Sequence, residues 1–157
     1  METKINSVQA FILAGGQSSR MGTDKALVPF RGIPMMQHSI RLLSELFTSI
    51  TIVSNHESHH EFGLEVIPDA FEKIGPLGGI IAGLRNSTAE MNFFMACDMP
   101  MVTSPIIKSL LEAVNTNDCI TASYNGKSET LCTLYPKSAL PLLEEMASKQ
   151  QHRLYDM

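Results

Sequence analysis

Short apolar runs alternate along the chain with longer amphipathic stretches. Four runs of apolar or β-branched residues predict buried strands, because each is short and ends at glycine or polar residues; they span residues 8–13, 49–55, 64–69 and 92–98. Within the run at 92–98, residues 93–97 are continuously apolar, which is typical of a central parallel strand. Two further strands are predicted at 118–124 and 130–136.

Helical spacing separates these strands. Residues 34–47 carry apolar side chains at positions 35, 36, 40, 43, 46 and 47, and Pro34 suits a first helical turn. The glycine-rich stretch 75–87 is expected to become helical near Gly78. A third helix is expected to start with Ser104 as its cap and Pro105 in the first turn, and a fourth covers residues 138–150.

The alternation of strands and helices predicts an α/β fold, namely a three-layer, Rossmann-like domain with a mainly parallel sheet. In such sheets ligands bind beyond the carboxyl ends of the strands. Polar or glycine residues stand at four predicted strand ends; they are Gly15-Gly16, Asn55, Asp69 and Asp98. A binding site is therefore expected at that edge of the sheet.

Composition narrows the function classes. A chain of 157 residues is expected to form one domain, residues 1–157, and its formal net charge of -4 argues against nucleic acid as a partner. No apolar run is long enough to span a membrane, and the first residues lack the apolar core of a signal peptide. The three cysteines are widely spaced, which favours reduced, mostly buried thiols in a cytoplasmic protein over a zinc site or a disulfide.

The loop after the first strand has the composition of an anion-binding site. Gly15 and Gly16 let the backbone approach a ligand closely, and Arg20 and Lys25 supply positive charge against a polyphosphate. Neither the dinucleotide-binding glycine fingerprint nor the P-loop pattern occurs. On composition alone, a flexible glycine turn with solvated charges remains the alternative.

Carboxylates stand at two other strand ends. Asp98 follows the most apolar strand, where a hard divalent cation such as Mg²⁺ would bridge it to phosphate oxygens; a turn aspartate before Pro100 is the alternative. Asp69 could hold a ribose hydroxyl or a base edge, and the backbone at Gly78 could contact a flat base, although ordinary loop chemistry would explain both. The histidines at 56, 59 and 60 are expected in an exposed polar loop.

The stretch "LAGGQSSRMGTDKAL" strongly resembles the opening motif of the molybdenum cofactor guanylyltransferases, which are MobA-like nucleotidyltransferases with a pattern close to LAGG-x-S-x-RMG-x-DK. The segments "GPLGGIIAGL" and "FFMACDMP" resemble the second and third motifs of that family, in the same order. The resemblance extends from about Val8 to the last predicted helix. It implies transfer of GMP from GTP to the phosphate of molybdopterin, or Mo-molybdopterin, with release of pyrophosphate and with Mg²⁺ as the cofactor.

The resemblance also implies roles for particular positions. The residues that match nucleotide contacts are Leu13, Ala14, Gly15, Asn55 and Asp69. Lys25 matches the lysine that meets the phosphates, Arg20 fits a basic position that faces the triphosphate, and Asp98 matches the aspartate that binds Mg²⁺ and nucleotide together. Molybdenum-insertion proteins and molybdoenzyme chaperones are the protein partners that such a function suggests.

Members of that family usually continue into a segment with an "N-x-N-TPEE"-like motif, which this sequence does not contain. That segment is expected to complete the pterin side of the site, so pterin binding is the function that its absence would affect. Two alternatives to guanylyl transfer therefore stand beside it: a nucleotidyltransferase that uses CTP or a sugar phosphate, and a nucleotide-binding protein that is inactive without the missing segment. LAGG rather than LAAG favours guanine.

Overall fold

The computed structural model describes residues 4–15, 22–71, 73–115, 118–151 and 153–154, so the predictions for Gly16 and Arg20 lie outside the described residues. The centre is a six-stranded sheet with the order β5-β4-β1-β6-β8-β7. Its strands are β1 (Val8–Leu13), β4 (Ile50–Val53), β5 (Glu65–Ile67), β6 (Met91–Ala96), β7 (Ile120–Tyr124) and β8 (Lys127–Pro136). All six strands predicted from the sequence are present, with shifted ends at most of them.

The sheet is mainly parallel. Strand β1 pairs in parallel with both β4 and β6, and β4 pairs in parallel with β5. Strand β8 is antiparallel to β6 and to β7. Strands β7 and β8 form a hairpin in which Tyr124 faces Lys127, so the turn between them consists of Asn125 and Gly126. Both turn residues have positive φ, 51° and 75°, as this tight kind of hairpin turn requires.

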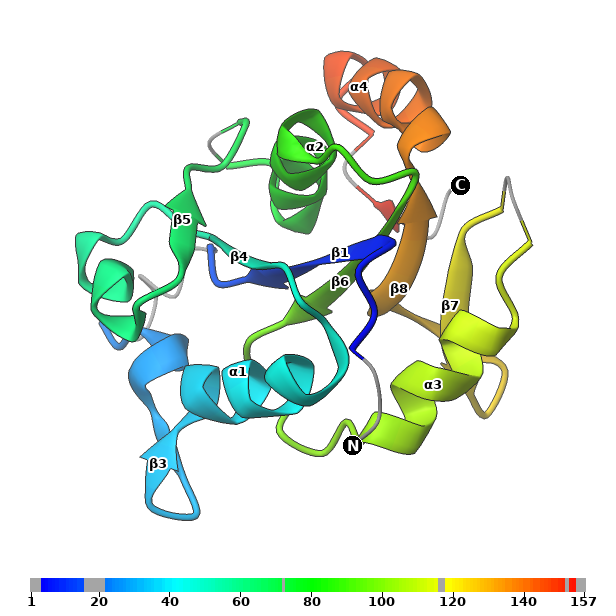
Figure 1. The fold of residues 1–157 in the computed structure, drawn as a ribbon. Coiled ribbons are helices and arrows are strands. Elements are labelled where there is room, and N and C mark those ends of the chain that lie inside the picture. Colours follow the sequence, from blue (N-terminus) through cyan, green and yellow to red (C-terminus); the bar gives the residue numbers. More distant parts are fainter. Residues whose placement is uncertain (1–3, 16–21, 72, 116–117, 152, 155–157) are drawn as a thin grey trace.

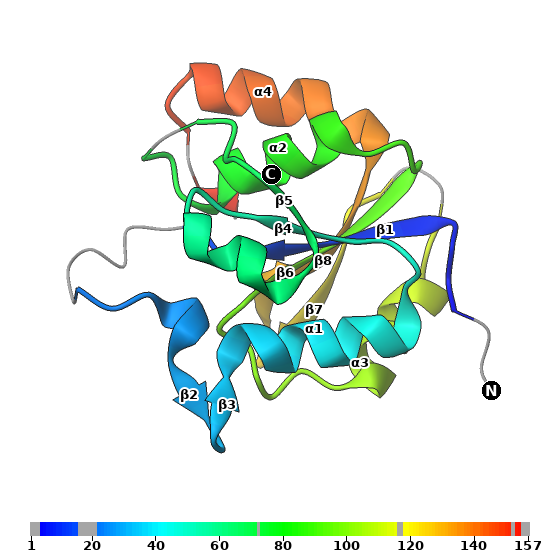
Figure 2. The ribbon, with the colours of Figure 1, turned by 60° about the vertical axis from the view of Figure 1, so that its left-hand side comes forward.

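Helices cover both faces of the sheet, which confirms the three-layer expectation. Helices α2 (Pro76–Asn86) and α4 (Leu140–Ser148) lie on one face, and α1 (Met35–Leu46) and α3 (Ser104–Glu112) lie on the other (Figures 1 and 2). Successive residues of the central strands pack alternately against the helices on one face of the sheet and against those on the other. Ile12 and Phe93 join the core beneath α1 and α3, whereas Phe11 and Phe94 join the core beneath α2 and α4. The rings of Phe11 and Phe94 stack with centroids 4.9 Å apart.

All four helix starts differ from expectation, and α4 begins at Leu140 rather than at residue 138. Helix α2 begins at Pro76 rather than near Gly78. Helix α3 begins at Ser104, and Thr103 takes the cap position without a side-chain capping bond, so the cap predicted at Ser104 is wrong by one residue. Pro34 takes the position before α1 because it pairs in a small hairpin of β2 (Pro29–Phe30) and β3 (Ile33–Pro34), which the apolar pattern did not indicate.

Candidate active site

A pocket opens at the carboxyl ends of β1 and β6, the edge that the topology predicts for a ligand. Its lining comes from five parts of the chain that meet there: the end of β1, the short 3-10 helix η2 (Lys25–Leu27), the start of α2, the end of β6 and the first half of β8. The lining residues are Leu13, Ala14, Gly15, Asp24, Lys25, Ala26, Pro76, Ala96, Cys97, Asp98 and Leu131. Five of the predicted site residues are among them: Leu13, Ala14, Gly15, Lys25 and Asp98.

The backbone ladder continues past the strand ends and fixes this edge. The Ala14 amide donates to the Val53 carbonyl at 3.0 Å, and the Cys97 amide donates to the Leu13 carbonyl at 3.0 Å. Because these bonds hold the residues just beyond β1 and β6, Gly15 and Asp98 leave the sheet from well-defined positions.

Lys25 and Asp98 face each other across the pocket. The ammonium Nζ of Lys25 lies 3.5 Å from Oδ2 of Asp98, and their side chains are 63% and 39% exposed. An ion pair with that exposure contributes little to stability, so its charges remain accessible to a ligand. The arrangement places a cation and a carboxylate at one point, which suits binding of phosphate oxygens on one side and of a hard cation on the other.

Asp69 forms a second part of the site next to Gly15. A Cβ on Gly15 would lie 3.5 Å from Oδ2 of Asp69, and a Cβ on Gly78 would lie only 2.2 Å from Oδ1. The Asp69 amide donates to Oδ1 of Asn55 at 3.0 Å, and its carboxylate accepts from the Phe71 amide at 3.1 Å. The three predicted residues Asn55, Asp69 and Gly78 are therefore brought together beside the pocket, although they do not line it.

Burial raises the pKa of the Asp69 carboxyl above its ordinary value, and the backbone hydrogen bonds from Phe71 and Ala70 partly oppose that rise. The absence of a side chain at Gly78 is what allows this carboxyl to lie against the start of α2. A half-buried carboxyl with acceptor capacity beside the pocket can accept hydrogen bonds from a sugar hydroxyl or a base edge.

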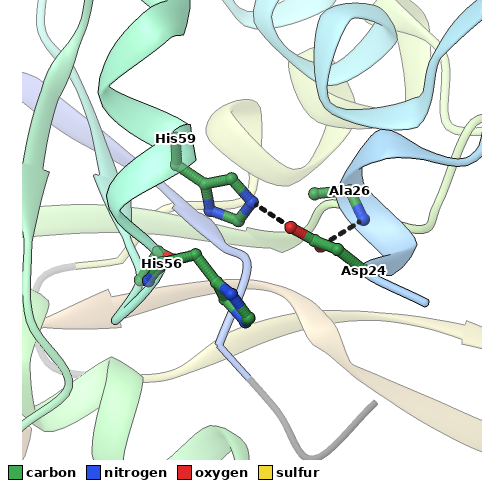
Figure 3. Close-up of polar contacts among 5 residues, drawn as sticks. Asp24, Ala26, His56 and His59 are labelled. Carbon is green, nitrogen blue, oxygen red and sulfur yellow. Dashed lines mark hydrogen bonds and ion pairs between the residues drawn. The ribbon is translucent and has the colours of Figure 1, made fainter. Parts of the chain in front are cut away.

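The histidine prediction is wrong for one residue. His56 and His60 are exposed as expected, but His59 is completely buried in the short 3-10 helix η3 (Glu57–Phe62). Its Nε2 lies 2.7 Å from Oδ2 of Asp24. Figure 3 shows the two side chains pointing toward each other. The physical reason is the contact between the loop after β4 and the loop after β1, which sequence spacing does not reveal.

Six residues that line the pocket were not singled out as site residues from the sequence: Asp24, Ala26, Pro76, Ala96, Cys97 and Leu131. Burial, together with the nearby Asp98 carboxylate, raises the pKa of the Cys97 thiol to about 12, so this side chain stays protonated and uncharged near neutral pH. Cys97 therefore acts as a small apolar wall of the pocket rather than as a nucleophile. Cys132 is also buried, whereas Cys119 is exposed, and all three are free.

The donor set fits a hard cation held mostly by substrate. In the described part of the chain, no group of three or more histidine, cysteine, aspartate or glutamate side chains is arranged to hold a metal. Among the described residues that line the pocket, Asp98 pairs with Lys25 through Oδ2, whereas Asp24 uses one oxygen for His59 and the other for the Ala26 amide. Mg²⁺ is commonly bound by one or two carboxylates together with substrate phosphates, which matches this arrangement.

Among the described residues, no helix has the length and apolar character needed to cross a bilayer.

Comparisons with known proteins point to one family. The MobA-like NTP transferase domain matches residues 10–156. The chain is 37% identical to the molybdenum cofactor guanylyltransferase of Vibrio atlanticus, covering 91% of this chain and 76% of that protein. It is 34% identical to the molybdenum cofactor guanylyltransferase of Vibrio cholerae, covering 92% and 75%. Among solved structures, molybdopterin-guanine dinucleotide biosynthesis protein A from Archaeoglobus fulgidus superposes with a TM-score of 0.76 at 23% identity, covering 94% and 76%. Because this match spans residues 10–156 of the 157 in the sequence, the chain belongs to the MobA-like NTP transferase domain family.

Proposed function

We propose that this protein is a molybdenum cofactor guanylyltransferase, a nucleotidyltransferase that transfers GMP from GTP to molybdopterin or Mo-molybdopterin. The observation that supports this most directly is the meeting of Lys25 and Asp98 at the carboxyl edge of the sheet, beside Gly15. The names of the relatives support the choice of substrates. The whole chain, residues 1–157, would act as one domain.

In the reaction, a phosphate oxygen of molybdopterin attacks the α-phosphorus of GTP. The bond from that phosphorus to the oxygen bridging the α- and β-phosphates breaks, and pyrophosphate leaves with the bonding electrons. Such transfers depend on positioning and on neutralisation of charge rather than on a covalent enzyme intermediate. The chain's task is therefore to hold two anionic substrates in line.

Each part of the site has a role in that task. Lys25 would bind the triphosphate and stabilise the charge that develops on the leaving pyrophosphate. Arg20, outside the described residues, would add to this charge. The nucleotide would be contacted after β1 by Leu13, Ala14, Gly15 and Gly16. Its nucleoside part would be bound by Asn55, Asp69 and the backbone at Gly78.

Asp98 would hold Mg²⁺ together with phosphate oxygens. When bound, the metal supplies positive charge to the phosphates and a template for their orientation. Lys25, whose Nζ lies 3.5 Å from the same carboxylate, would help to orient Asp98 toward the pocket. Molybdenum-insertion proteins and molybdoenzyme chaperones would be the partners that deliver the pterin and receive the product.

A product assay tests the function. Purified protein, GTP, Mg²⁺ and molybdopterin on its carrier should release pyrophosphate and form the guanine dinucleotide, and omission of the pterin should abolish the release. Calorimetry with GTP, CTP and UTP should give the tightest binding for GTP. Tighter binding of CTP would show that the site prefers cytosine to guanine. Tight GTP binding without pyrophosphate release would favour an inactive nucleotide-binding protein.

A further inference from the structure

Asp24 stands directly before Lys25 and has both carboxylate oxygens in use. Oδ1 accepts from the Ala26 amide at 3.0 Å, and Oδ2 lies 2.7 Å from Nε2 of His59. The Asp24 carbonyl also accepts from the Leu27 amide at 3.1 Å. Asp24 is thus the N-terminal cap of η2, the turn that carries Lys25 into the pocket.

His59 holds this cap from the other side, as Figure 3 shows. Because a carboxylate only accepts hydrogen bonds, Nε2 of His59 is the donor. The His59 side chain is 0% exposed, while the Asp24 side chain is 17% exposed. The ring of His59 packs against the rings of His56 and Phe62, with centroids 5.2 Å and 6.2 Å away, so its direction is fixed.

The second nitrogen of His59 indicates that packing is not the reason for a histidine here. Nδ1 is buried and has no hydrogen-bond partner within the described part of the chain. A buried polar atom without a partner costs free energy, so an apolar side chain would fill this space better. The contribution that an apolar side chain cannot make is the hydrogen bond to Asp24.

We propose that His59 is a positioning residue for nucleotidyl transfer, which acts through Asp24 to hold the η2 turn so that Lys25 points at Asp98 and at the phosphates of the substrate. The inference rests on the proposed function of Lys25. His59 touches neither the nucleotide nor Lys25, and its effect passes through the cap that fixes the Lys25 backbone.

The same contact connects the two halves of the site. His59 lies four residues after Asn55, whose Oδ1 accepts from the Asp69 amide on the nucleoside side. Asp24 lies one residue before Lys25 on the phosphate side. The hydrogen bond between His59 and Asp24 therefore joins the loop after β4 to the loop after β1, and it sets the distance between the nucleoside contacts and the phosphate contacts.

Three substitutions test this role. His59→Met fills the space but removes the donor, whereas His59→Gln keeps an amide donor near the position of Nε2. His38→Met is the matched control, because His38 also makes one 2.7 Å hydrogen bond, to the Phe30 carbonyl, away from the pocket. Inorganic tripolyphosphate has no nucleoside, so its affinity measured by calorimetry depends only on the phosphate side of the site, where Lys25 lies. We expect His59→Met to weaken tripolyphosphate binding about tenfold, as loss of a hydrogen bond to a charged group should, while His59→Gln and His38→Met remain close to wild type.

A double-mutant cycle on GTP separates positioning from general damage. If His59 acts through Lys25, His59→Met should weaken GTP binding in the wild-type background but cause little further loss when Lys25→Met is already present. Guanosine, which lacks phosphates, should bind equally to wild type and His59→Met. Equal losses in both backgrounds, an equal loss for guanosine, or unchanged tripolyphosphate binding would overturn the inference.

Three further outcomes are informative. If His59→Met does not fold, as thermal unfolding would show, His59→Asn replaces it, because the shorter amide cannot reach Asp24, and the same expectations apply. Wild-type protein that fails to bind tripolyphosphate would also overturn the inference. Wild-type protein that shows the His59 effect on tripolyphosphate, but makes no product from GTP and molybdopterin, would contradict the proposed function alone.

Discussion

Lys25 Nζ lies 3.5 Å from Asp98 Oδ2, although the two residues are 73 positions apart in the sequence. The parallel pairing of β1 with β6 is what brings them together, since each residue follows the carboxyl end of one of these strands. Neither side chain is buried, so the pair is better suited to binding than to stability. The first prediction follows from this pair.

Asp98→Asn should lower Mg²⁺-dependent pyrophosphate release by about 100-fold or more, because the amide keeps the shape of the side chain but loses the charge that would hold the metal. The melting temperature should stay near that of wild type. Glu112→Gln, an exposed carboxyl at the end of α3, is the matched control and should retain full activity. Full activity in Asp98→Asn would remove this residue from the metal site.

Gly78→Ala should disrupt the nucleoside side of the site. The new Cβ would lie 2.2 Å from Oδ1 of Asp69 and 2.9 Å from the Phe71 carbonyl oxygen, so Asp69 must move. We expect a loss of stability of about 1–3 kcal/mol, as for other overpacked sites, and weaker GTP binding measured by calorimetry.

Gly83→Ala is the control for that experiment. Its Cβ would lie 2.5 Å from Cε1 of Phe94 in the core, away from the pocket. It should destabilise the protein by a similar amount, about 1–3 kcal/mol, yet leave the affinity for GTP unchanged. If both alanine variants bind GTP equally well, the Gly78 backbone and Asp69 do not form part of the nucleotide site.

The raised pKa of Asp69 predicts a pH dependence of stability. Since burial raises this pKa above its ordinary 3.8, the folded state holds the proton more tightly than the unfolded state. The stability that this group contributes is therefore fully present below pH 3.8 and is lost as the pH rises through the raised pKa. Urea unfolding at several pH values should show Asp69→Asn gaining stability relative to wild type as the pH rises.

Glu145→Gln provides a control of opposite sign. The hydrogen bond and charge of Lys149 lower the pKa of the Glu145 carboxyl below its ordinary 4.5. Its contribution is present above that value and is lost as the pH falls through the lowered pKa. The glutamine variant should therefore gain relative stability toward acid pH, and the same trend in both variants would contradict the assignment for Asp69.

The three cysteines should differ in reactivity. Burial raises the pKa of Cys97 to about 12 and that of Cys132 to about 11, so at pH 8 only about one thousandth of the Cys132 thiol, and less of Cys97, is ionised. Cys119 is exposed. Brief treatment with iodoacetamide, followed by peptide mass spectrometry, should find the label on Cys119 first. Early labelling of Cys97 would show that the pocket wall opens in solution.

Much of this arrangement follows from the sequence because parallel strands bring their carboxyl ends to one edge. That rule alone places Gly15, Asn55, Asp69 and Asp98 near one another, and the structure agrees. Residue propensities and apolar spacing also predict the order of strands and helices along the chain. The predicted helix caps are wrong by one or two residues.

The burial of His59 and its contact with Asp24 could not be predicted from the sequence. In "NHESHH" three histidines share one polar stretch, and no local pattern distinguishes the buried one from its exposed neighbours. Only the packing of η3 against the loop after β1 selects it. Leu131 had a usable signal: Asn125-Gly126 marks a two-residue hairpin turn, which fixes β8 as antiparallel to β7 and sends its first half past the end of β6.

That hairpin makes one wall of the pocket separable from the rest. The parallel strands β1, β4, β5 and β6 depend on crossover helices, whereas β8 reverses through two residues and pairs with β6 only from Cys132 onward. Residues 127–131 thus project beyond the last β6 pair and are held by β7. Lengthening or shortening this projection in matched pairs of residues leaves the alternation of inward and outward side chains intact. Changes in this projection can therefore reshape the wall of the pocket at Leu131 while Gly15, Lys25 and Asp98 stay in place.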